Sequence, residues 1–105
     1  MYLFFSDPPR DVTILSSSWS SVVVNWSSPF NETTIDFVDL YQITVLSAQE
    51  PVIIQTNKTF VHIDGLKQLT EYRLLVQAGN RLGLGPPLGR GKHFWTKGES
   101  EDRKS

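Results

Sequence analysis

The feature that most constrains this chain of 105 residues is the alternation of apolar and polar side chains over short stretches. In the clearest case Val22, Val24 and Trp26 share one face, and Val23 and Asn25 share the other. Successive side chains of a β-strand point to opposite faces, so this pattern predicts a strand with one buried face. Seven such stretches occur and none has sustained helical periodicity. The chain is therefore expected to be all-β, with two antiparallel sheets packed together.

Turn-forming residues separate the predicted strands. We expect the serines at 16–18 to form the turn between the first two strands, and Asp64 with Gly65 to end the fifth. The fourth strand is expected near residues 52–55. The remaining inward-facing residues are expected to be Val12 and Ile14 in the first strand, Tyr41, Ile43 and Val45 in the third, Val61, Ile63 and Leu66 in the fifth, Tyr72, Leu74, Val76 and Ala78 in the sixth, and Phe94 in the seventh.

Charge and composition exclude several classes of function. The chain has 10 basic and 11 acidic side chains and a net charge of −1, so it lacks the field of one sign that would recruit nucleic acid. It has no cysteine, so neither a disulfide framework nor a thiolate metal site is possible. No apolar run reaches the length of a membrane span, and we expect no direct membrane insertion by this segment.

The order of several residues makes the chain resemble a fibronectin type III domain over about residues 7–97. The resemblance implies a seven-stranded immunoglobulin-like β-sandwich with ABE and C′CFG sheets. In such a sandwich Trp26 fills the core, and the hydroxyl of Tyr72 bonds to backbone upstream. We expect the structural core to include Trp26, Tyr41, Leu66, Tyr72 and Val76. The matching residues are Pro8, Pro9, Trp26, Pro29, Tyr41, Gly65, Leu66, Thr70, Glu71, Tyr72, Ala78, Asn80, Gly83, Gly85 and Thr96.

The chain departs from the family pattern at two places. Gln68 and Leu69 stand where the family usually has proline and often glycine. Leu88 replaces a frequent serine, and the glycines at 89 and 91 predict a bulge at the start of the last strand. We expect residues 1–6 to be a linker and residues 98–105 a disordered linker or tail. The whole then looks like an excised piece of a longer protein.

No arrangement of residues predicts an active site, a cofactor site or a metal site. The alternation turns His62 and His93 outward, and nothing places a serine and a carboxylate around either one. Glu32, Asp36 and Asp39 could supply oxygen ligands to calcium, but their spacing matches no cation-binding loop. Solvated loop acids are the better interpretation. The domain is therefore not expected to be an enzyme, although a parent protein could carry a kinase or phosphatase domain elsewhere.

Two surface motifs have an ordinary structural explanation. The basic residues Arg73, Arg81, Arg90 and Lys92 could form a stripe for a sulfated polysaccharide, yet alternating surface charge produces such stripes by default. Asp64 with Gly65 could imitate an integrin-type acidic motif, but it is better interpreted as a turn.

Three of the four asparagines begin acceptor triplets for N-linked glycans: Asn25, Asn31 and Asn57. Chance predicts roughly one such triplet in a chain of this composition. Asn25 can carry a glycan only because the alternation turns it away from the core. The excess of triplets favours an extracellular location, either at the plasma membrane or secreted. Polar loops that match by chance remain the alternative.

Strand directions place apolar loop residues together at one end of the sandwich: Phe30, Ile35, Phe37, Leu82 and Leu84. Such a cluster, when exposed, marks a contact surface. It could pack against a neighbouring domain of the same chain, or the B–C and F–G loops could bind another protein. We favour the contact with a neighbouring domain.

Together these features predict a non-catalytic extracellular spacer and protein-interaction module of a modular cell-surface receptor or adhesion protein. The alternative is an intracellular fibronectin type III scaffold domain of a cytoskeletal or ubiquitin-pathway protein, which the absence of cysteine leaves open.

Overall fold

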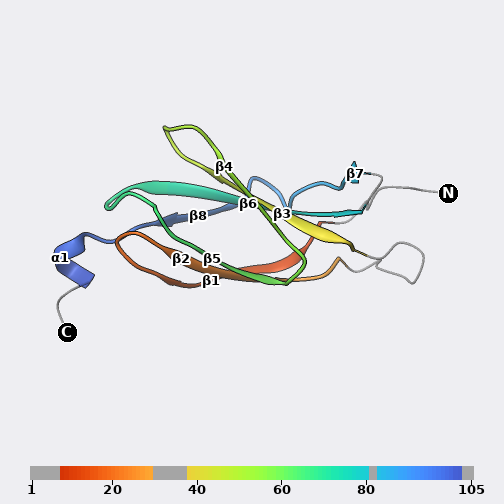
Figure 1. Cartoon of the computed structure of the whole chain (residues 1–105), viewed down its shortest axis with the longest axis horizontal. Coiled ribbons are helices and arrows are strands. Elements are labelled where there is room, and N and C mark those ends of the chain that lie inside the picture. Colours follow the sequence, from red (N-terminus) through yellow and green to blue (C-terminus); the bar gives the residue numbers. More distant parts are fainter. Residues whose placement is uncertain (1–7, 30–37, 81–82, 103–105) are drawn as a thin grey trace.

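The computed structural model describes residues 8–29, 38–80 and 83–102, which form two β-sheets packed face to face (Figure 1). One sheet has the order β1-β2-β5 and consists of β1 (Arg10–Ser17), β2 (Val22–Ser27) and β5 (Phe60–Ile63). The other has β4 (Val52–Thr56), β3 (Leu40–Leu46) and β6 (Glu71–Asn80) in that order, with β7 (Gly83–Leu84) and β8 (Lys92–Trp95) both paired to the free edge of β6. All these pairings are antiparallel. The predicted sandwich and its ABE and C′CFG sheets are confirmed.

The core lies between the inner faces of the two sheets, as the alternation predicts. The five residues expected to form the structural core are all buried: Trp26, Tyr41, Leu66, Tyr72 and Val76. The ring of Trp26 meets that of Tyr41 edge to face, with centroids 5.4 Å apart, and the ring of Tyr72 stacks on Phe94 at 5.5 Å. Each aromatic pair joins two strands and adds directional contact to the apolar burial.

The last strand is irregular where it begins, as predicted, but a loop interrupts it in place of the predicted bulge. Residues 85–91 lie opposite residues 75–78 of β6, so the chain has three more residues here than β6 has. β7 and β8 are the two parts of the last strand that pair with β6 on either side of this loop. Gly91 lies where the strand rejoins β6. It has a φ of 96°, and a Cβ there would lie 2.7 Å from the carbonyl oxygen of Leu74. Only glycine tolerates both conditions.

The structure differs from the sequence predictions in the first turn and the C-terminal segment. β1 continues through Ser17, so the turn consists of residues 18–21 and the placement of Ser16 and Ser17 in the turn was wrong. Register shifts between β1 and β2 accommodate the longer strand. Residues of the C-terminal segment expected to be disordered form a single helical turn, α1 (Glu99–Asp102), and the Glu99 N–H donates to the side-chain oxygen of Gln68 at 2.9 Å.

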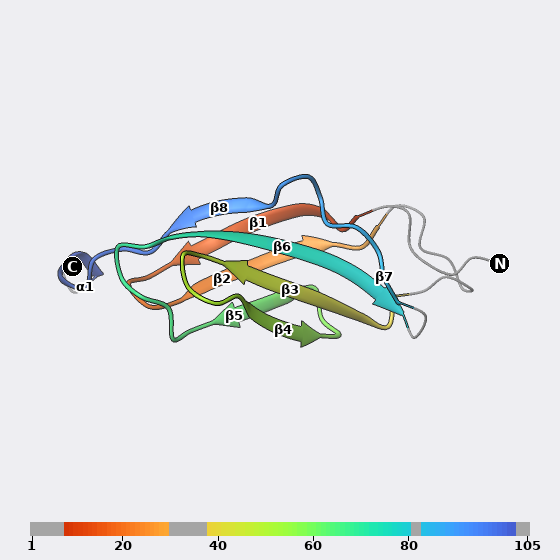
Figure 2. The same ribbon diagram turned by 90° about the horizontal axis from the view of Figure 1, so that it is seen from above.

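Strand directions separate the two ends of the sandwich. β1 and β8 run the same way, and β2, β4 and β6 run the opposite way (Figure 2). β1 therefore begins at one end, and α1 lies at the other. The latter, the C-terminal end, also contains the turn between β5 and β6 (residues 64–70). Within the described residues no helix has the length and apolar character needed to cross a membrane.

Candidate interaction surface

The apolar cluster predicted at the end where β1 begins falls mostly outside the described residues. Phe30, Ile35, Phe37 and Leu82 all lie there, and only Leu84 can be placed. Leu84 is 36% exposed, and its Cδ2 packs so closely on Gly79 that a Cβ at that glycine would be 2.7 Å away. Leu84 therefore packs partly against β6.

Two of the three asparagines in glycan acceptor triplets lie within the described residues. Asn25 is on β2, the central strand of its sheet, on the face opposite the buried Val24 and Trp26, and it is partly exposed. Asn57 is exposed in the turn between β4 and β5. Asn31 lies outside the described residues. Both described positions give the asparagine side chain access to solvent.

Those residues considered for catalysis or metal binding that the structure describes do not gather into a site. His62 and His93 are both exposed, and His93 Nδ1 lies 3.1 Å from Glu71 Oε2. Among the described residues no group of three or more histidine, cysteine or acidic side chains could hold a metal ion. Asp39 is exposed, whereas Glu32 and Asp36 lie outside the described residues.

The basic residues considered for polysaccharide binding do not form a continuous described stripe. Arg90 and Lys92 are exposed and Arg73 is partly buried, while Arg81 is outside the described residues. Arg73 belongs to a concave surface near the C-terminal end, which the sequence analysis did not identify.

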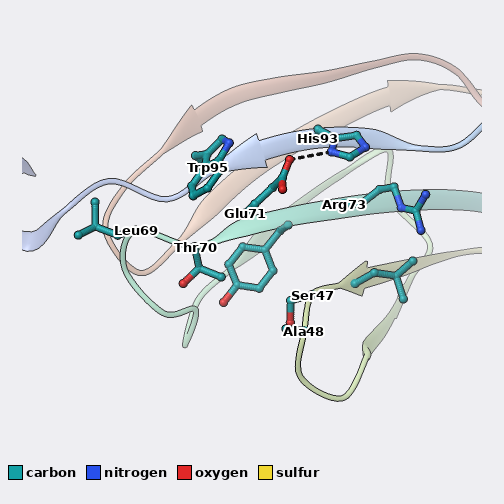
Figure 3. Close-up of a pocket in the computed structure, with 10 residues that line it drawn as sticks. Ser47, Ala48, Leu69, Thr70, Glu71, Arg73, His93 and Trp95 are labelled. Carbon is teal, nitrogen blue, oxygen red and sulfur yellow. Dashed lines mark hydrogen bonds and ion pairs between the residues drawn. The ribbon is translucent and has the colours of Figure 1, made fainter.

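This concave surface has a volume of about 530 Å³ (Figure 3). It spans the outer face of β6 and β8, the turn between β5 and β6, and the end of β3 with the residues that follow it. Glu71, Arg73, His93 and Trp95 line it from the strands, and Leu69 lines it from the turn. Trp95 is 60% exposed and Leu69 is 62% exposed. Two large apolar side chains displayed beside a hollow are a feature of protein contact surfaces. We call this region the Trp95 surface.

Leu69 adopts an unfavourable backbone conformation to occupy its place. Its φ is 52°, in the left-handed region that costs a side-chain-bearing residue roughly 1–2 kcal/mol. This is the position where the family pattern often has glycine. Because the leucine side chain is mostly exposed, its burial within this domain does not offset the free energy of the backbone strain. Departure from the glycine pattern at Leu69 is one sequence signal for the surface, whereas the backbone strain at Leu69 depends on a dihedral angle.

Hydrogen bonds fix the backbone that leaves β8 beside the Trp95 surface. Thr96, which is 3% exposed, accepts the Thr70 N–H through Oγ1 at 3.0 Å and donates the same hydroxyl to the Lys67 carbonyl. The Lys97 N–H donates to Ser18 O at 3.0 Å, and the Leu69 N–H donates to Lys97 O at 3.2 Å. Hydrogen bonds thus hold residues 96–99 against two turns, the one between β1 and β2 and the one between β5 and β6.

The polar side chains on the Trp95 surface are partly paired with one another. Glu71 pairs with His93, as shown by the dashed line in Figure 3. The side chain of Arg73 makes no hydrogen bond or ion pair within the described part of the chain, although its Cγ lies near Gly91. Lys97, the next outward residue after Trp95, is also exposed. The surface therefore carries a guanidinium group as well as apolar side chains, with Glu71 and His93 between Arg73 and Trp95 (Figure 3).

Comparison with known proteins gives relatives much longer than this chain. It is 29% identical over 83 residues to tyrosine-protein phosphatase Lar of Drosophila melanogaster, covering 75% of this chain and 4% of that protein. It is 32% identical over 88 residues to cell adhesion molecule DSCAML1 of Gallus gallus, and the match covers 75% of this chain and 4% of that protein. It is 31% identical over 83 residues to Target of Nesh-SH3 of Homo sapiens, and the match covers 76% of this chain and 8% of that protein. The chain spans less than a tenth of each relative.

Solved structures share the sandwich. The FN1–FN3 domains of chicken CNTN1 match with a TM-score of 0.76 and 26% identity, covering 89% of this chain and 32% of that one. The FN5 domain of Drosophila Lar matches with a TM-score of 0.74 and 22% identity, and the match covers 90% of this chain and 99% of that one. At this identity the match is evidence for the fold only. The family model for the fibronectin type III domain matches residues 7–90. This chain therefore belongs to the fibronectin type III family.

Proposed function

We propose that this domain is a non-catalytic spacer and protein-interaction module in the extracellular part of a modular receptor or adhesion protein, and that the Trp95 surface contacts the domain that follows it. The observation that carries the proposal is the pair of exposed apolar residues, Leu69 and Trp95, beside one hollow. Leu69 is strained as well as exposed, which is understandable where its side chain is buried by a partner.

The fixed route of the C-terminal segment supports an occupant joined to this end. The backbone from Thr96 to Glu99 is hydrogen-bonded to the turn that carries Leu69. A folded domain attached shortly after α1 is therefore held close to the Trp95 surface at a high effective concentration. Even a modest contact then sets the angle between the two domains. This arrangement suits a spacer, since β1 begins at the opposite end of the sandwich.

The chemistry of the surface defines the partner. An apolar side chain would pack on Trp95 and Leu69, while a carboxylate would pair with the guanidinium of Arg73, which favours bidentate carboxylate contacts. We therefore expect the facing surface to combine an apolar residue with an aspartate or glutamate. Phe30, Ile35, Phe37, Leu82 and Leu84 would make the corresponding contact at the other end, with the preceding domain or with another protein.

Small-angle scattering of the full-length protein tests the contact at the Trp95 surface. Leu69→Gly removes the side chain while suiting the left-handed backbone, and it should broaden the distribution of interdomain distances. Ile53→Ser is the matched control, because Ile53 is also 60% exposed but lies on β4, at the far edge of the same sheet. A distribution unchanged by Leu69→Gly would contradict the proposed contact.

The extracellular location rests on Asn25, Asn31 and Asn57, and a separate measurement tests it. Mass spectrometry of the domain secreted from mammalian cells should find glycans on at least one of the three. If all three are unmodified, the intracellular scaffold role becomes the better interpretation.

A further inference from the structure

An exposed aromatic ring lies directly across a strand pair from Asn25. Phe60 on β5 is the register partner of Asn25 on β2, and its side chain is 52% exposed. Asn25 belongs to the outer face of the β1-β2-β5 sheet, because its neighbours Val24 and Trp26 are buried. Phe60 faces the same side, because it is paired with Asn25 across the two strands. A half-exposed phenylalanine therefore stands next to an asparagine that begins an acceptor triplet, Asn25-Trp26-Ser27.

The hydrogen-bonding pattern brings these two side chains close together. The Trp26 N–H donates to Thr59 O at 2.9 Å, so that pair is a hydrogen-bonded one in the β2–β5 ladder. The pairs alternate along antiparallel strands, which makes Asn25 and Phe60 a pair without mutual backbone hydrogen bonds. Side chains of such pairs approach most closely, with Cβ atoms about 4.5–5.5 Å apart.

Phe60 is the apolar residue paired directly across from Asn25, and Val23 lies next to Asn25 on the same face of β2. On the other side, Thr13 of β1 is paired with Asn25, and the Thr13 hydroxyl donates to Asp11 O at 2.9 Å. The Lys58 ammonium lies 5.6 Å from the centre of the Phe60 ring, which puts the ring within reach of a cation. The ring nevertheless keeps half of its surface open to solvent.

We propose that Phe60 is a packing platform for the first N-acetylglucosamine of a glycan carried by Asn25. The sugar is attached to the asparagine amide nitrogen, and in the proposed arrangement its pyranose ring lies over Phe60 at the adjacent cross-strand position. Its C–H face is apolar and weakly positive, and it complements the negative face of an aromatic ring. The glycan would thereby cover Phe60 and stabilise the β1-β2-β5 sheet. This inference rests on the extracellular location in the proposed function.

The test uses the domain secreted from mammalian cells, with Asn31→Gln and Asn57→Gln so that Asn25 is the single acceptor. Endoglycosidase trimming to one N-acetylglucosamine gives the probe, and bacterial expression of the same sequence gives the sugar-free reference. Mass spectrometry measures occupancy, and denaturant unfolding measures the folding equilibrium. With Phe60 present, the single sugar should raise the folding equilibrium constant about threefold to tenfold, as expected for an added aromatic contact.

Variants of Phe60 identify the source of that gain. Phe60→Thr keeps a residue that favours β-strands, so the domain should still fold, but the sugar should then raise the equilibrium constant less than about twofold. Phe60→Tyr should keep the gain. An equal gain in Phe60→Thr overturns the inference, and so does an Asn25 that remains unmodified. Glycans on Asn31 or Asn57 in the chain with all three acceptors would leave the extracellular assignment standing even if Asn25 fails.

Discussion

The backbone N–H of Lys67 donates a 2.9 Å hydrogen bond to the hydroxyl oxygen of Tyr72. The Tyr72 ring is buried and stacked on Phe94, so its hydroxyl reaches out of the core to hold the turn between β5 and β6. The same turn carries Leu69 and receives the hydroxyl of Thr96 through Lys67 O. Core packing and the position of the Trp95 surface are thus physically connected.

Tyr72→Phe should lower the free energy of unfolding by about 1–2 kcal/mol, because it removes this hydrogen bond and leaves the ring in place. Denaturant unfolding measures the loss. The slope of the transition should not change, since the surface exposed on unfolding is nearly the same. A variant as stable as the parent would mean that water replaces the tyrosine hydroxyl without cost.

Thr96→Val should destabilise the domain by about 1–3 kcal/mol, because it leaves the Thr70 N–H without its acceptor and the Lys67 carbonyl without its donor. Thr96→Ser is the control, since serine retains the hydroxyl and should lose less than about 1 kcal/mol. Hydrogen exchange should also accelerate at the amides of Thr70 and Leu69 in the valine variant. A valine variant as stable as the parent, with a loss only in Thr96→Ser, would show that the methyl group, not the hydroxyl, matters.

Gly91→Ala should cost substantially more stability than Gly89→Ala. Both glycines have positive φ, 96° and 57°, so both substitutions carry backbone strain of about 1–2 kcal/mol. Only at Gly91 would the new Cβ also meet backbone, 2.7 Å from Leu74 O, whereas nothing lies within 4 Å at Gly89. Thermal unfolding of both variants measures the difference. Similar melting temperatures would contradict the close approach of Gly91 to the carbonyl oxygen of Leu74.

Leu69→Gly should leave the isolated domain as stable as the parent, or raise its stability by up to about 1 kcal/mol. Relief of strain at φ 52° is offset by the greater flexibility of glycine in the unfolded chain. The leucine side chain contributes little burial, because it is 62% exposed. Denaturant unfolding checks this, and a loss above about 1 kcal/mol would show that Leu69 serves the fold itself.

The sandwich and its core could be predicted from sequence because alternation is a local property of each strand. Val22, Val24 and Trp26 needed only the period of two to be placed on one buried face. The extent of β1 could not be predicted. Two shifts in the register between β1 and β2 allow Ser16 and Ser17 to pair with Val23 and Val22, so both serines remain in the strand. A serine cluster looks like a turn whether or not a bulge extends the strand.

The Trp95 surface was not predicted, although part of its signal was present. Phe94 was correctly expected to face inward, which implies that Trp95 faces outward. Its significance depends on Leu69, a residue of the turn between β5 and β6, and the strain at that position depends on a dihedral angle. The buried indole nitrogen of Trp26, which has no hydrogen-bond partner among the described residues, was equally invisible from sequence.

Oxidative footprinting of Trp95 tests the central claim most directly. The rate of hydroxyl-radical oxidation of Trp95 is measured in the isolated 105-residue domain and in the full-length protein, with the exposed Ile53 on β4, at the far edge of the same sheet, as the internal reference. A following domain seated on the Trp95 surface predicts severalfold slower oxidation of Trp95 in the full-length protein, restored toward the isolated rate by Leu69→Gly. Equal rates of Trp95 oxidation in the isolated domain and the full-length protein would contradict the account.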